Sequence, residues 1–108
     1  MKETDDRIKE LVAKWLESLE ERERSQAELL DAYFTFRRNL PGNDPGFGKA
    51  VEDPKTTQDI IDELRPMMLL PEELVVQYMR IHAYGMKTMG DGTVKWAIWR
   101  FIDVTSLT

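Results

Sequence analysis

The residues best suited to chemistry in this chain are a lone histidine and the sulfur side chains near it. His82 is the single histidine of the 108 residues, with Met79 three residues before it and Met86 four residues after it. Thioether sulfur and imidazole together can hold cuprous copper. Methionine is also a common filler of apolar cores, and Gly85 is expected to end a helix before Met86. We therefore predict a packed histidine, with no metal and no cofactor.

Acidic side chains offer a second kind of chemistry, general acid–base catalysis. Asp59, Asp62 and Glu63 share one short predicted helix, where paired carboxylates could also bind a hard cation. With 20 acidic residues in the chain some such grouping is unavoidable, and no Glu-x-x-His pair is present. The main prediction is that the chain is not an enzyme. A small enzyme that combines carboxylates with His82 is kept as an alternative.

Two further segments carry patterns associated with phosphate or nucleic acid. Gly42 and Gly48 enclose five residues, and Lys49 is followed by alanine, so a P-loop's spacing and hydroxyl are both missing. The segment from Lys95 to Arg100 alternates cations with tryptophans, as in surfaces that stack single-stranded bases. Because this segment is strongly apolar, core packing is the main prediction. The alternative function is a dimeric nucleic-acid-binding regulator that uses its Trp, Lys and Arg side chains.

Composition is typical of a cytoplasmic protein with one domain, covering residues 1–108. The chain is 42% apolar and 32% charged, and it has no cysteine for disulfides or thiolate metal sites. It shows no signal peptide and no apolar run that could cross a membrane. The net charge is −5, with −7 over residues 1–75 and +2 over residues 76–108. Such a field repels phosphates, so nucleic acid is not the expected partner.

The elements that position these residues are predicted to be helices. Apolar residues recur at helical spacing from Ile8 to Phe36, but seven polar residues, 20–26, interrupt the stripe. Ser25 and Glu28 form a potential capping box, which favours two helices that meet at Ser25. One continuous helix of about 33 residues would be about 50 Å long, too long for a compact domain. Any exposed part of the stripe would support a homodimer.

The second half of the chain is predicted to add shorter helices after a long loop. Residues 39–57 are rich in Gly and Pro, and Thr56 or Thr57 then caps a helix from Gln58 to about Arg65. A further helix begins at Pro71. Residues 94–104 fit a helix, although they also fit a strand paired with residues 86–89. The predicted fold is all-α, a compact bundle of four to five helices; the alternative is α+β with a short C-terminal β-hairpin.

Without a motif that carries chemistry, we predict a non-enzymatic protein–protein interaction module. Adaptors, assembly factors and small acidic inhibitors, including those that phages encode, share this size and charge. We recognise no family signature in any stretch of the chain. The residues predicted to contact a protein partner are Glu17, Glu20, Glu21, Arg22, Glu23 and Phe47.

Overall fold

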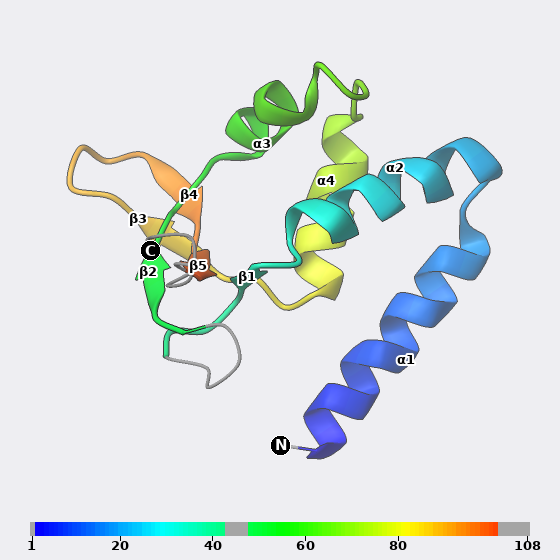
Figure 1. Ribbon diagram of the computed structural model, residues 1–108, viewed down its shortest axis with the longest axis horizontal. Helices are drawn as coiled ribbons and strands as arrows, with labels where there is room; N and C mark the ends of the chain where they lie inside the picture. Colours follow the sequence, from blue (N-terminus) through cyan, green and yellow to red (C-terminus); the bar gives the residue numbers. More distant parts are fainter. Residues whose placement is uncertain (1, 43–47, 102–108) are drawn as a thin grey trace.

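The computed structural model describes residues 2–42 and 48–101, with side chains from residue 6 onward. Within this part the chain forms four helices and five short strands (Figure 1). The helices are α1 (Lys2–Ser18), α2 (Glu21–Tyr33), α3 (Thr57–Leu64) and α4 (Glu72–Ile81). The strands are β1 (Arg37–Arg38), β2 (Ala50–Glu52), β3 (Met86–Thr88), β4 (Val94–Trp96) and β5 (Trp99–Phe101).

The prediction of an all-α helical bundle is wrong, because the described part of the chain contains two antiparallel sheets. β5 lies between β1 and β2 in one sheet, and β3 pairs with β4 in the other. Residues 94–101, predicted to be helical, form β4 and β5, while residues 102–104 lie outside the described residues. The α+β alternative with a hairpin is confirmed. Main-chain partners distant in sequence override the helical spacing, as where the Trp96 N–H donates to the Lys55 carbonyl at 2.7 Å.

The predicted break between the first two helices exists, but it lies at Leu19 and Glu20 rather than at Ser25. The Glu23 carboxylate accepts a hydrogen bond from the Glu20 backbone N–H at 3.1 Å, as in a capping box. Ser25 lies inside α2, where its hydroxyl donates to the Glu21 carbonyl at 3.3 Å. Glutamate is a less usual N-cap than serine, so the pattern favoured the wrong residue.

The main core lies where α2, α3 and α4 pack against the hairpin. Thr56 caps α3 as predicted, since its hydroxyl accepts a hydrogen bond from the Asp59 N–H at 2.9 Å. A smaller cluster of Leu19, Ala27 and Leu74 closes the corner between α1, α2 and α4. The buried members of the main core are Leu30, Phe34, Ile60, Ile61, Leu64, Leu70, Val75, Tyr78, Met79, Trp96 and Ile98.

α4 ends in a Schellman motif that has an alanine where glycine is usual. The Tyr84 N–H donates to the Met79 carbonyl at 2.9 Å, and the Ala83 N–H donates to the Arg80 carbonyl at 3.0 Å. Ala83 adopts a left-handed φ of 62°, a strained conformation for a residue with a Cβ. The helix was expected to end at Gly85, but the chain turns two residues earlier.

Ala83→Gly is therefore expected to raise the free energy of unfolding by about 1 kcal/mol, because glycine adopts this conformation without the Cβ clash. Urea denaturation followed by far-UV circular dichroism measures the change. The matched control is Ala13→Gly at an exposed position within α1, which should lower stability by up to about 1 kcal/mol. Destabilisation by both substitutions would contradict the strain at Ala83.

Candidate functional site

α2 lies between two surface grooves, which we name the acidic groove and the apolar groove. The acidic groove, with a volume of about 240 Å³, is lined by Leu16 and Glu17 of α1 and by Arg24, Glu28 and Asp31 of α2. The apolar groove, with a volume of about 590 Å³, is lined by Arg22, Ser25 and Gln26 of α2 and by Met68 and Leu69 of the α3–α4 loop. The first two turns of α2 thus contribute side chains to both grooves.

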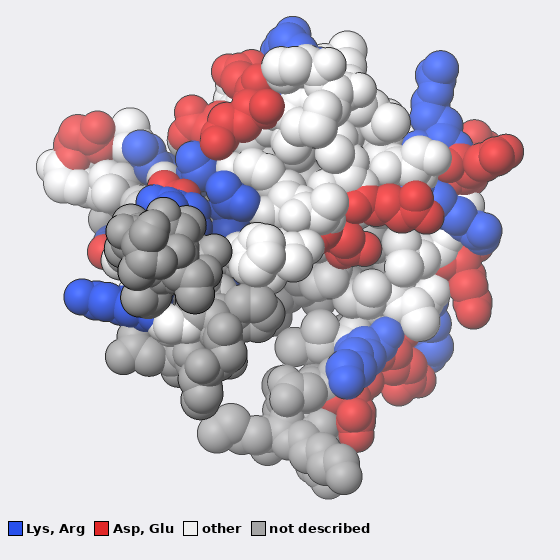
Figure 2. Space-filling model, in the orientation of Figure 1, with Lys and Arg blue, Asp and Glu red and all other residues white. Residues whose placement is uncertain are grey.

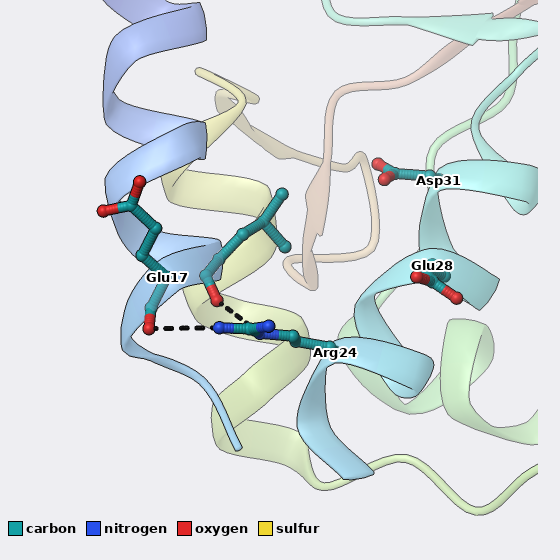
Figure 3. Close-up of a pocket in the computed structure, with 5 residues that line it drawn as sticks. Glu17, Arg24, Glu28 and Asp31 are labelled. Carbon is teal, nitrogen blue, oxygen red and sulfur yellow. Dashed lines mark hydrogen bonds between the residues drawn. The ribbon is translucent and has the colours of Figure 1, made fainter. Parts of the chain in front are cut away.

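The acidic groove presents three carboxylates, while its single cation is engaged with the backbone. Arg24 donates from Nε to the Leu16 carbonyl at 3.0 Å and from Nη2 to the Glu17 carbonyl at 3.4 Å (Figure 3). Those carbonyls belong to the last turn of α1, where a cation also complements the helix dipole. Figure 3 shows Glu28 and Asp31 along α2, across from Glu17 on α1. This arrangement favours cationic groups of a partner.

The apolar groove combines exposed apolar side chains with a buried polar atom that has no partner. Leu69, which lines the groove, is 63% exposed, and Met67 of the same loop is 64% exposed. Gln26 is only 6% exposed, and its Nε2 donates to the Leu69 carbonyl at 3.3 Å. Its Oε1 is buried without a hydrogen bond. Leaving such an acceptor unpaired costs about 1–3 kcal/mol.

The structure divides the predicted contact residues between the two sides of α2. Glu17 lines the acidic groove, whereas Arg22 lines the apolar groove. The Glu20 backbone N–H donates to the Glu23 carboxylate at the start of α2, so these two residues also stabilise the helix end. Glu21 is exposed in the first turn of the helix. Phe47, the sixth predicted contact, lies outside the described residues.

The sequence prediction missed the residues that form most of the two grooves. Gln26 and Leu69 come together from positions 43 residues apart, which no local pattern shows. One signal was available, because the run Pro66-Met67-Met68-Leu69-Leu70-Pro71 places apolar residues between two prolines. Proline at both ends marks a loop, and large apolar side chains in a loop indicate a docking surface.

The apolar stripe from Ile8 to Phe36 is used largely inside the domain. Leu19 and Leu30 are buried, and the Trp15 indole N–H donates to the Gln77 side-chain oxygen at 3.0 Å. Leu11 remains 50% exposed on α1. Phe36, at the end of the stripe, is 55% exposed as well, so self-association through the stripe would rest on these two positions.

Charge is divided between the helices and the strands. The four helices contain 14 acidic and seven basic residues, whereas the five strands contain one acidic and five basic residues. On the face shown in Figure 2, Lys and Arg side chains gather over the strands at the left. Within the segment from Lys95 to Arg100, Trp96 and Ile98 are buried, as core packing predicts, while Trp99 is half-buried. A cationic partner is therefore better matched to the helices than to the strands.

His82 packs among aromatic side chains beside an acid. Its ring stacks on Tyr78 with centroids 4.0 Å apart, and its Nε2 lies 4.0 Å from Asp31 Oδ1, too far for a hydrogen bond. Burial lowers the pKa of His82, and the Asp31 carboxylate opposes this shift. Among the described residues, no three His, Asp or Glu side chains are arranged to share a metal ion. His82 is thus a packed ring whose neutral form is favoured by burial.

No protein-family model matches the chain, and searches of curated proteins and of solved structures found no significant match. In the part of the chain that the structure describes, no helix has the length and apolar character needed to cross a membrane. The grooves and their residues are therefore the features on which a function can be argued.

Proposed function

We propose that the protein is a non-enzymatic protein-binding module whose contact surface is α2 with its two grooves. The observation that carries this proposal is the apolar groove, where Met68 and the exposed Leu69 lie beside Gln26, whose Oε1 is unpaired. Protein interfaces combine an apolar centre with a polar rim, and methionine is enriched in them. Adaptors, assembly factors and inhibitors all bind in this way.

The chemistry of the two grooves indicates what the partner presents. An aliphatic or aromatic side chain fits against Met68 and Leu69, and the flexible thioether of methionine adapts to irregular shapes. Polar groups next to that side chain would lie against Arg22 and Ser25, which also line this groove. Lysine or arginine residues would complement the carboxylates of the acidic groove on the other side of α2. The expected partner is therefore a basic segment with apolar anchor residues.

A random peptide library displayed on phage tests this surface with no partner chosen in advance. Selected peptides are expected to combine Lys or Arg with large apolar residues, and their binding should weaken as salt is raised. The double variant Met67→Ser/Leu69→Ser should bind them at least about tenfold more weakly, because it removes the two exposed apolar side chains of the α3–α4 loop, one of which lines the groove. Calorimetric titration with the selected peptides measures both effects.

The matched control is Leu40→Ser, which removes an apolar side chain that is 60% exposed and lines neither groove. This variant should bind the peptides as the unmodified protein does. Equal binding to the double variant and to the unmodified protein would place the contact surface elsewhere and refute the proposal.

A further inference from the structure

A third cavity has a volume of about 360 Å³. It adjoins the acidic groove, because Asp31 lines both of them. Its volume falls at the lower end of the range for small-molecule sites, which is roughly 300–1,000 Å³. Its principal lining residues come from three segments: Asp31 and Phe34 at the end of α2, Arg37 of β1, and Tyr78, His82 and Tyr84 around the end of α4.

One wall of this cavity is aromatic and uncharged. The Phe34 ring stacks on Tyr78 with centroids 5.6 Å apart and contacts the Tyr84 ring at 5.0 Å. Burial raises the pKa of Tyr78 and of Tyr84, so both phenols keep their protons at neutral pH. The His82 ring also stacks on the Tyr78 ring, with centroids 4.0 Å apart, and so continues this group of packed rings. Such a wall suits a flat apolar body.

Two buried nitrogen atoms of the lining residues have no hydrogen-bond partner: Nε of Arg37 and Nε2 of His82. The Arg37 guanidinium donates from Nη1 to the Tyr33 carbonyl and lies 3.9 Å above the Tyr33 ring. Among the described residues it forms no ion pair with a carboxylate. The guanidinium is half-buried and has no counter-ion within the described part of the chain, so a carboxylate ligand would form a charge-assisted contact with it.

The charge of the lining has the sign that such a ligand requires. Arg37 and Arg38 face one carboxylate, that of Asp31, so the lining is positive by one unit when His82 is neutral. The chain as a whole carries −5. Asp31 is also occupied, because its Oδ1 accepts a hydrogen bond from the Tyr78 hydroxyl at 2.7 Å. The cavity is thus a local exception to the acidic character of the helices.

The backbone around His82 is held in one conformation. The Asn39 side-chain amide donates to the carbonyls of His82 and Ala83 at 3.0 and 3.2 Å. These bonds tie Asn39, the residue after β1, to the left-handed turn at Ala83, where the backbone is strained. Strained residues fixed by their surroundings are often found beside binding sites.

We propose that this cavity binds a small aromatic carboxylate. The ring of the ligand packs against Phe34, Tyr78 and Tyr84, and its carboxylate lies against the guanidinium of Arg37, which lines the cavity. The site does not depend on the grooves beside α2 for its chemistry. It therefore stands or falls separately from the proposed protein-binding function.

The probe is 1-naphthoate, titrated into the isotope-labelled full chain and followed by two-dimensional amide NMR. Shifts are expected at Phe34, Arg37 and Tyr84, with little change at Met68 and Leu69 of the apolar groove. The neutral analogue 1-naphthamide should bind at least about tenfold more weakly, because it cannot neutralise Arg37. Equal affinity for acid and amide, or no shifts at the cavity, would overturn the proposal.

Arg37→Gln should weaken naphthoate binding at least about tenfold, whereas Arg80→Gln makes the same charge change at an exposed position of α4 and should have no effect. If Arg37→Gln does not fold, the comparison of the acid with the amide on the unmodified protein decides the outcome. A peptide that ends in tryptophan with a free carboxylate presents the same chemistry from a macromolecule. Tighter binding of that peptide than of naphthoate would overturn the assignment to a small molecule.

Discussion

Replacing Trp96 with alanine is expected to lower the free energy of unfolding by about 4 kcal/mol, the typical loss for a large aromatic core residue. Trp96 is 6% exposed and belongs to the main core. Its indole N–H donates to the Thr57 hydroxyl at 2.9 Å, which joins β4 to the first turn of α3. The substitution leaves a cavity and removes this bond. A domain of this size is stable by about 5–15 kcal/mol, so the variant would be close to unfolding.

Urea denaturation followed by far-UV circular dichroism measures this loss without relying on tryptophan fluorescence. Thr57→Val keeps the shape of the side chain and removes the indole's acceptor, so it isolates the hydrogen bond at about 1–2 kcal/mol. Trp99→Ala removes a half-buried tryptophan from β5 and should cost less than Trp96→Ala. Equal losses of stability for Trp96→Ala and Trp99→Ala would contradict the packing of the β3–β4 hairpin on α3 through Trp96.

The parts of the fold that the sequence predicts correctly are those whose signals are local. For α3, the Thr56 cap and the apolar positions Ile60, Ile61 and Leu64 all fall within nine residues. A cap and an apolar face at helical spacing are sufficient to define a short helix. The same signals place the start of α4 next to Pro71.

The strands could not be predicted in this way, because their partners are distant in sequence. Val94, Ala97, Ile98 and Phe101 keep helical spacing, yet the Ala97 N–H donates to the Gly85 carbonyl at 2.8 Å. Asp53 likewise donates its N–H to the Ile98 carbonyl at 2.8 Å. Apolar residues on both faces of a segment are compatible with either state, and only these pairings decide between them.

The candidate contact surface was predicted only in part, because some of its residues are also distant from one another in sequence. The charged start of α2 is visible in the sequence as a polar interruption of an apolar stripe. Two of its glutamates, Glu20 and Glu23, are also engaged with each other at the helix start, so their charge alone does not establish a binding role. The apolar groove depends on how the α3–α4 loop packs on α2, and the acidic groove on how α1 packs on α2; both follow from the tertiary structure and not from any local pattern.

Leu30→Ala is expected to lower the free energy of unfolding by about 3 kcal/mol, whereas Leu29→Ala should cost about 1 kcal/mol. Leu30 is fully buried in the main core, and its neighbour Leu29 is only partly buried at its edge. The buried residues of α2 are Gln26, Ala27 and Leu30, so Leu30 is the largest apolar side chain that attaches this helix to the domain. The adjacent pair is therefore a matched comparison on one helix.

The same substitution connects stability to the proposed function. If Leu30 holds α2 in place, Leu30→Ala should increase amide hydrogen exchange along α2 more than along α3, under conditions where the variant is still folded. The grooves on both sides of α2 would loosen with it, and peptides selected on the unmodified protein should bind the variant more weakly. Unchanged exchange along α2, or equal losses of stability for Leu29→Ala and Leu30→Ala, would contradict the attachment of α2 through Leu30. In that case the contacts of α1 and of the α3–α4 loop with α2 would have to hold the two grooves.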